Sequence, residues 1–132
     1  MIQQGRGADR QTLLFLRRRF PLLYTLPAGH VEREAEPEAE MRREVLEETG
    51  LAVQASRRLW PGAAWEIADP CRRGADWHAW HVYQVEAIGQ PRLSEEGRII
   101  GWYTDAEVQE LADHELLALP VRAILQRAGV VH

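Results

Sequence analysis

The chain has 132 residues, of which 45% are hydrophobic and 27% charged, so we expect one folded domain over residues 1–132. Its apolar runs are far shorter than the roughly 20 residues that a transmembrane helix needs, which excludes a membrane-spanning protein. The formal net charge of −4 argues against a dedicated DNA- or RNA-binding surface, because such surfaces usually carry a basic excess.

The residue inventory also excludes several kinds of catalysis. All 16 basic side chains are arginine, so the chain has neither a Schiff-base lysine nor a phosphate-loop lysine. Its two serines, Ser56 and Ser94, lie outside the G-x-S-x-G pattern of a serine nucleophile. Cys71 is the only cysteine, and it has no neighbour at disulfide or zinc-ligand spacing. A lone reduced thiol and the absence of a visible secretory leader predict a cytoplasmic protein.

Apolar periodicity and turn residues predict the elements in chain order. The first half is expected to contain strands over residues 12–18 and 22–26, a helix over 36–49 and a strand over 51–60. Only residues 1–4 precede the first turn, GRGADR, so a strand there would be truncated or very short.

The second half is expected to contain an irregular segment, two strands separated by a polar loop, and two helices. The ranges are 61–74 for the irregular segment, 77–86 and 98–103 for the strands, 89–97 for the loop, and 106–111 and 115–128 for the helices. Asp105 is the expected N-cap of the first of these helices. Strands and helices are mixed without a βαβα rhythm, which predicts an α+β fold with a mixed sheet between helices.

The helix over residues 36–49 has the clearest terminal signals. Glu36 and Glu38 fall in its first turn, where the helix dipole favours acids, and Pro37 suits the first helical position. Gly50 follows the last turn as the expected C-terminal cap.

Four glutamates form an acidic ridge on this helix. At about 100° per residue, Glu44, Glu47 and Glu48 share one sector, and Glu40 lies one turn earlier. Like charges at this spacing repel by a few tenths of a kcal/mol per pair, whereas the same oxygens suit Mg²⁺ or Mn²⁺. The plain alternative is a solvated acidic face.

The residues around this ridge resemble a known motif. Gly29, followed by Arg43-Glu44-Val45-x-Glu47-Glu48-x-Gly50-Leu51, resembles the Nudix box, G-x5-E-x7-R-E-U-x-E-E-x-G-U, in which U is aliphatic. The preceding Leu26-Pro27-Ala28-Gly29 is similar to the family's LPGG approach. The resemblance implies the Nudix fold, an α/β/α sandwich with a mixed β-sheet.

The chain departs from the motif at Ala35, where the family usually has glutamate. Glu34 and Glu36 flank this position, and Glu40 adds an acid on the ridge. Three interpretations stay open: a neighbouring acid supplies the missing oxygen, the family's glutamate is auxiliary here, or activity is weakened or lost.

The resemblance also implies roles for individual residues. Glu44, Glu47 and Glu48 would bind Mg²⁺ or Mn²⁺, as more than one ion in the family's manner. Arg43 would orient a ligating glutamate, while Gly29 and Gly50 would be needed for their backbone.

The catalytic base and the substrate contacts are less sharply defined by the motif. The base is expected among Glu44, Glu47 and the loop residue Glu96, with Glu95 as the alternative to Glu96. Among the substrate contacts we expect Arg18, from the run of arginines at 17–19, and His30. Trp80 is expected in the core, and Trp65 and Trp77 either stack on a base or join the core.

The resemblance implies a Mg²⁺-dependent hydrolase, a pyrophosphohydrolase that cleaves a diphosphate bond in a nucleoside diphosphate linked to another moiety. The expected partner is therefore a small nucleotide-like molecule, and a homodimer is compatible with the sequence. Two alternatives remain: a nucleotide-binding or regulatory module of the same fold with little turnover, and a structural domain with an acidic helix.

Overall fold

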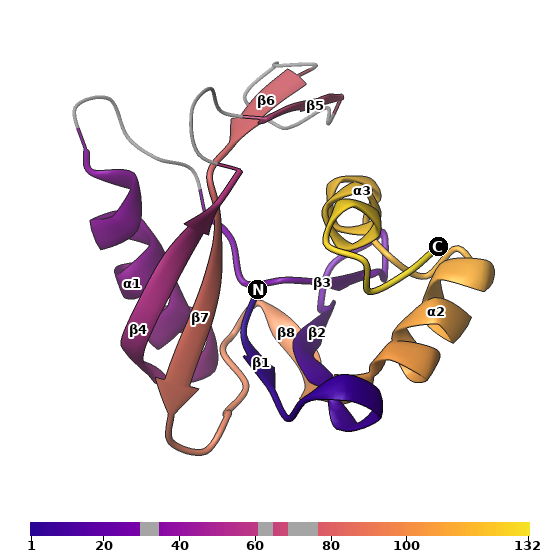
Figure 1. The fold of residues 1–132 in the computed structure, drawn as a ribbon, viewed down its shortest axis with the longest axis horizontal. Coiled ribbons are helices and arrows are strands. Elements are labelled where there is room, and N and C mark those ends of the chain that lie inside the picture. Colours follow the sequence, from indigo (N-terminus) through magenta and orange to yellow (C-terminus); the bar gives the residue numbers. More distant parts are fainter. Residues whose placement is uncertain (30–34, 61–64, 69–76) are drawn as a thin grey trace.

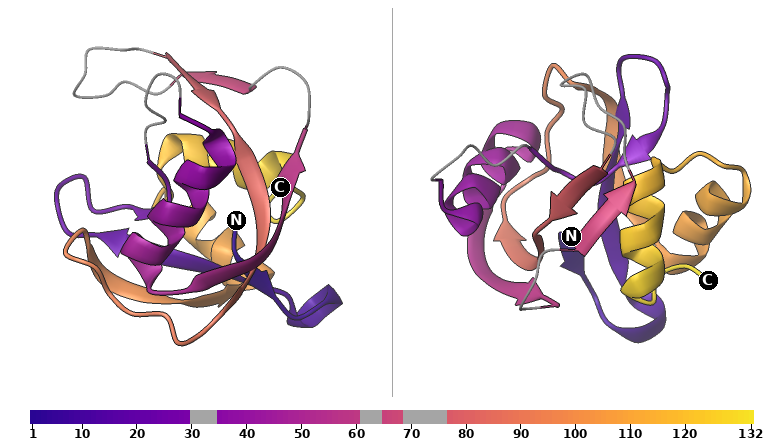
Figure 2. Two further views of the ribbon diagram at one scale, coloured as in Figure 1. Left: turned by 90° about the vertical axis from the view of Figure 1, so that its left-hand side faces the viewer. Right: turned by 90° about the horizontal axis from the view of Figure 1, so that it is seen from above.

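Helices enclose the strands of this protein on two sides. The computed structural model describes residues 1–29, 35–60, 65–68 and 77–132. Helix α1 (Pro37–Thr49) lies on one side of the strands, and α2 (Asp105–Asp113) and α3 (Leu119–Arg127) lie on the other (Figure 1; Figure 2, right). The predicted α/β/α arrangement is confirmed.

A four-stranded antiparallel sheet forms around β2 (Gln11–Arg17). Strand β8 (Gly97–Thr104) pairs along one edge of β2, with Leu14 opposite Gly101. The other edge pairs with two short strands, β1 (Gln3–Gln4) and β3 (Tyr24–Thr25). The first strand of the chain is thus very short, as one of the two predicted alternatives had it.

A second antiparallel pair, β4 (Ala52–Leu59) and β7 (Val82–Ile88), lies between α1 and the first sheet (Figure 1). A parallel bridge between Ile2 and Val85 joins the two groups of strands, which makes the arrangement mixed, as predicted. Strands β5 (Trp65–Ala68) and β6 (Trp77–Trp80) form a separate antiparallel pair beyond the start of β7 (Figure 1).

The core lies on both faces of the strands. Leu13 and Leu14 are both fully buried, although successive side chains of a strand point to opposite faces. Leu13 packs in a cluster with Val45 of α1, whereas Leu14 packs with Ile124 of α3. This two-sided burial explains why the sequence of β2 is a continuous apolar run rather than an alternating one.

Both ends of α1 follow the local sequence. The helix begins at Pro37 after Glu36, which is extended, and its first turn holds Glu38 and Glu40. Gly50 ends the helix in the left-handed region, with φ of 74°, and its N–H donates to the carbonyl of Leu46. The predicted bounds of 36–49 are therefore correct to within one residue.

The two C-terminal helices differ from prediction at their starts. Thr104, not Asp105, caps α2: its side chain accepts a hydrogen bond from the N–H of Glu107. Asp105 instead pairs with Arg10. Helix α3 begins at Leu119 rather than at 115, because Glu115 adopts a left-handed φ of 57° and the next residues bridge to Tyr24 of β3.

The strand predictions were wrong in four places. The strand expected over 77–86 is divided at His81, because its first part pairs with β5 and its second part with β4. Residues 65–68 form β5, although all of 61–74 was expected to be irregular. The strand expected over 22–26 is limited to Tyr24–Thr25, and the loop expected to end at 97 gives Gly97 to β8.

Two further expectations from the sequence concern the cysteine and membrane-spanning helices. Cys71 lies outside the described residues. Among the residues that are described, no helix has the length and apolarity needed to cross a membrane.

Candidate active site

The acidic ridge of α1 is divided between an inner and an outer part. Glu48 is 7% exposed, and only 19% of the Glu44 side chain is exposed. Glu47, in contrast, has 56% of its side chain exposed. The three glutamates that share a helix sector therefore meet different surroundings: two point into the protein, and the third faces solvent.

Glu48 is a carboxylate buried among other carboxylates. Its Oε2 accepts a hydrogen bond from the backbone N–H of Ala28 at 2.9 Å. Burial raises the pKa of Glu48 to about 9, with further contributions from the charges of Glu44 and Glu96 and from a hydrogen bond to Glu96. Without a cation, this group of acids holds a proton at neutral pH.

Glu44 lies in the same electrostatic environment. Its pKa is also raised, first by burial, which outweighs the opposing charge of Arg43, and then by Glu47 and Glu96. Glu44 and Glu48 each interact with Glu96, so the loop before β8 and the helix α1 bring three acids to one place.

Arg43 bonds the other three glutamates of the ridge but not Glu48. One guanidinium nitrogen donates to Oε2 of Glu40 at 2.6 Å and to Oε1 of Glu44 at 3.0 Å. The other donates to both carboxylate oxygens of Glu47, at 2.9 and 3.1 Å. Arg43 therefore neutralises the outer side of the ridge and leaves Glu48 without a cationic partner in the described part of the chain.

The two box glycines are required by close approach and by backbone conformation. A Cβ atom on Gly29 would overlap the carboxylate of Glu44. At Gly50, the left-handed φ already favours glycine, and a Cβ there would come within 2.7 Å of the Arg92 side chain. Gly29 thus lets the segment before the box lie directly against the acidic ridge.

Arg18 lies next to the loop that carries Glu96. Its backbone N–H donates to the carbonyl of Glu96 at 3.0 Å, and its guanidinium donates to the carbonyl of Gly97 at 3.4 Å. Because Glu96 also contacts Glu48, this strand end places Arg18 beside the acidic group. Glu95, the alternative to Glu96, is exposed like Glu96 but makes no such contact with Glu44 or Glu48 within the described residues.

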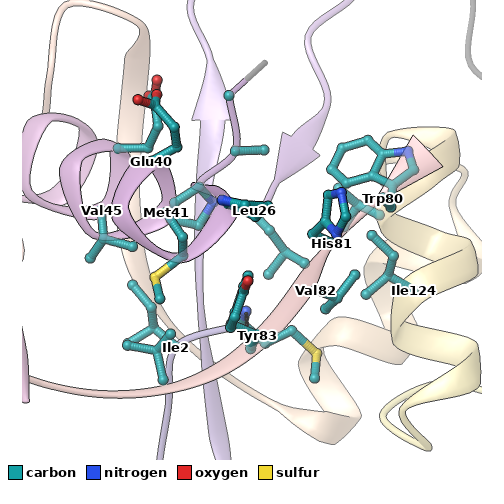
Figure 3. A pocket seen from close by; sticks show the side chains of 18 of the residues that line it. Ile2, Leu26, Glu40, Met41, Val45, Trp80, His81, Val82, Tyr83 and Ile124 are labelled. Carbon is teal, nitrogen blue, oxygen red and sulfur yellow. Dashed lines mark hydrogen bonds between the residues drawn. The ribbon is translucent and has the colours of Figure 1, made fainter. Parts of the chain in front are cut away.

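A cavity of about 550 Å³ opens beside α1, between it and the strands (Figure 3). Glu40 and Glu44 line one wall. The opposite side is formed by Trp80 and His81, where β6 meets β7, and by Ile124 of α3 (Figure 3). Most of the remaining lining is apolar, so the cavity joins an acidic end to a largely hydrophobic interior.

The chemistry of the inner acids fits a divalent cation. Carboxylate oxygens are the ligands that Mg²⁺ and Mn²⁺ prefer, and a cation would replace the proton that Glu48 otherwise holds. Over the ranges that the structure describes, no three acidic, histidine or cysteine side chains converge tightly enough to form a metal cage. Binding would therefore require side-chain movement, for which exposed Glu47 has room.

The structure thus brings some predicted site residues together and separates others. Glu44, Glu48 and Glu96 meet, Arg18 lies beside them, and Glu47 is turned toward Arg43. His30 lies outside the described residues, as does Glu34. Trp80 packs against the core, as expected, while the side chains of Trp65 and Trp77 lie outside the description.

Sequence reasoning missed two features of this region. One is the Ala28 N–H that holds Glu48, since a backbone donor leaves no mark in the sequence. The other is a hydrogen bond between Arg58 and His81 at the cavity wall, which joins residues 23 positions apart. Neither residue of that pair belongs to a motif.

Comparison with known proteins relates the chain to one family. A family model described as the NUDIX domain matches residues 4–125. No curated protein sequence matches the chain.

Solved structures share the fold at low sequence identity. A NUDIX hydrolase from Nitrosomonas europaea has a TM-score of 0.72 at 21% identity, covering 97% of this chain and 84% of that one. An Ap4A hydrolase from C. elegans, in a binary complex, has a TM-score of 0.64 at 17% identity, covering 85% and 81%. The NUDIX domain of Shewanella oneidensis NrtR, complexed with ADP ribose, has a TM-score of 0.63 at 16% identity, covering 96% and 80%. Because the family model spans nearly all of its residues, the chain belongs to the NUDIX domain family.

Proposed function

We propose that the chain is a Mg²⁺- or Mn²⁺-dependent hydrolase that cleaves a diphosphate bond in a nucleoside diphosphate linked to another moiety. Membership of the NUDIX family supports the reaction class. The similar structures support the substrate class: one is an Ap4A hydrolase and another holds ADP ribose. Both compounds contain phosphates joined to a nucleoside.

The observation that carries this proposal is the meeting of Glu48, which is buried and has no cationic partner among the described residues, with the partly buried Glu44 and with Glu96. A buried carboxylate whose pKa is raised to about 9 destabilises the fold at neutral pH, unless a cation binds there. A substrate diphosphate is also anionic, so it could approach these acids only with metal ions between them. The cavity beside α1 has room for the rest of such a substrate.

In this proposal Glu44 and Glu48 would hold the metal, with Glu47 as a further ligand if its side chain moves away from Arg43. The bound ions would neutralise phosphate charge and lower the pKa of the attacking water. The Ala28 N–H would hold the Glu48 carboxylate in place as one of these ligands. Arg43 orients Glu44 through its hydrogen bond at 3.0 Å.

Glu96 is the preferred general base. It comes from a loop outside the helix, so it can accept a proton from water without also being a helix ligand. Its contact with Glu48 places it at the acidic group, whereas Glu44 and Glu47 are both hydrogen-bonded to Arg43. Arg18, beside Glu96, is the proposed contact for a substrate phosphate.

Ala35 favours a second candidate, a nucleotide-binding module that turns over slowly. Against this candidate, Glu40 could replace the absent glutamate, because it lines the cavity and only 21% of its side chain is exposed. Slow or undetectable hydrolysis, together with tight binding of ADP-ribose, would identify the binding module instead.

The test is a substrate panel with Mg²⁺ and Mn²⁺, covering ADP-ribose, dinucleoside polyphosphates, oxidised nucleoside triphosphates and nucleotide sugars. We expect Glu48→Gln to lower turnover more than about 100-fold, since loss of even an outer-shell partner of a metal costs 10- to 100-fold. Glu47→Gln should act in the same direction. Glu110→Gln, an exposed acid of α2, serves as the control. Unchanged turnover in both Glu47→Gln and Glu48→Gln would refute the metal assignment.

A further inference from the structure

A charged side chain fixes the hydrogen-bonding state of a histidine in the cavity wall. Nη2 of Arg58, on β4, lies 2.8 Å from Nδ1 of His81, which follows β6. A guanidinium stays charged and can only donate, so Nδ1 must accept this bond and carry no proton. The ring proton of neutral His81 therefore sits on Nε2, which is left as a hydrogen-bond donor.

The surroundings keep this imidazole neutral. The pKa of His81 is lowered, first by burial and then by the charge of Arg58. Arg58 forms no salt bridge among the residues the structure describes, so no carboxylate cancels its charge beside the ring. His81 is thus a donor with a single tautomer rather than a group that shifts between two.

His81 lies in the wall of the cavity beside α1, where a substrate would bind. His81 lines the 550 Å³ cavity on the side away from Glu40, between Trp80 and Tyr83 (Figure 3). The lining around it is largely apolar, and Arg58 itself does not line the cavity. A substrate whose diphosphate lies at the acidic wall would therefore extend its uncharged, flat portion toward His81.

We propose that His81 is a specificity-determining residue, whose Nε2–H donates a hydrogen bond to an acceptor atom of the substrate's nucleobase, and that Arg58 is the positioning residue for its ring. The acceptor is a keto oxygen or an unprotonated ring nitrogen. The inference rests on the proposed function, because it takes the substrate to be a nucleotide. A ligand without such an acceptor would cover the half-buried donor without pairing it and would be bound less well.

The test combines ¹⁵N NMR of the His81 ring with binding and kinetics on the full chain. The probes are ADP, GDP, UDP and CDP, titrated in saturating Mg²⁺, followed by steady-state kinetics with whichever panel compound is hydrolysed. The variants are His81→Phe and Arg58→Met. Arg57→Met is the matched control, since Arg57 is the neighbouring arginine of β4 and hydrogen-bonds Gln84 instead.

In the wild type, we expect Nδ1 to show the shift of an unprotonated nitrogen and Nε2 to shift on binding at least one of the four diphosphates. His81→Phe should weaken that binding and raise KM by about five-fold, as for one neutral hydrogen bond, with kcat changed less than about two-fold. Arg58→Met should mix the His81 tautomers and raise its pKa, and Arg57→Met should do neither.

Failure of this inference can be distinguished from failure of the proposed function. If no compound is hydrolysed but a diphosphate still moves the Nε2 resonance, the proposed function fails and the role of His81 stands. If hydrolysis occurs while His81→Phe leaves KM and binding unchanged, the inference is overturned and the hydrolase remains. An Nε2 resonance that none of the four diphosphates moves also overturns it.

Discussion

Replacing Glu48 by glutamine should make the metal-free protein more stable, and increasingly so as the pH rises. Glu48 has a pKa of about 9 in the fold, against 4.5 for an ordinary glutamate, mainly because it is buried. Between these two pH values the folded chain binds one proton more than the unfolded chain. Stability therefore falls with rising pH throughout this window, whereas below pH 4.5 the group makes no difference.

The slope follows from the proton count, at about 1.4 kcal/mol per pH unit. From pH 6 to pH 8 the wild type should lose up to about 3 kcal/mol through Glu48 alone. A glutamine takes up no proton and can still accept the Ala28 N–H. The stability difference between Glu48→Gln and the wild type should accordingly widen by up to that amount.

The assay is urea denaturation in EDTA at pH 6, 7 and 8, compared between the wild type, Glu48→Gln and the exposed-acid control Glu110→Gln. Saturating Mg²⁺ should flatten the pH dependence of the wild type, because the cation displaces the proton. Parallel pH profiles for the wild type and Glu48→Gln in EDTA would refute the reasoning, since they would show that Glu48 binds no extra proton in the fold.

Three further substitutions test the local geometry. Gly29→Ala should reduce kcat by up to about 100-fold with little loss of stability, because the added Cβ displaces the Glu44 carboxylate; equal kcat values would contradict this. Gly50→Ala should lower the free energy of unfolding in urea by about 1–2 kcal/mol, given its φ of 74°, and an unchanged denaturation midpoint would argue against it. Thr104→Ala should cost about 1 kcal/mol through loss of the cap bonded to Glu107, seen as a lower Tm, and a Tm equal to that of the wild type would exclude the role.

The sequence predicts those parts of the fold whose signals are local. Helix α1 begins at Pro37, whose ring fixes a helical φ, and ends before Gly50, which readily adopts the left-handed φ of a helix end. Both effects are properties of the single residue. The start of α3 has no such independence. Residues 115–118 look helical in sequence, yet Tyr24 pairs with Leu117, and that competing contact comes from nearly a hundred residues away. The division of the strand at His81 has the same origin, since it depends on which partner strand each half meets.

For the candidate site, too, the sequence predicts only the features that depend on local spacing. Helical spacing places Glu44, Glu47 and Glu48 in one sector, but it does not say which of them other segments cover. The covering residues, Ala28 and Glu96, come from segments on either side of the helix in sequence. The Arg58–His81 pair depends on the juxtaposition of two strands and had no sequence signal at all.

The division of the acidic ridge favours a metal site over a solvated acidic face. On a solvated face, each glutamate would keep water around it and the repulsion between neighbours would be small. Glu40, Glu44 and Glu47 are compatible with such a face, since Arg43 hydrogen-bonds all three and offsets their charge. Glu48 differs, because it is buried against other acids without a cationic partner among the described residues, an arrangement that opposes folding at neutral pH. A divalent cation at this point would remove that opposition, and it would do so beside the wall of the cavity where a diphosphate has room to bind.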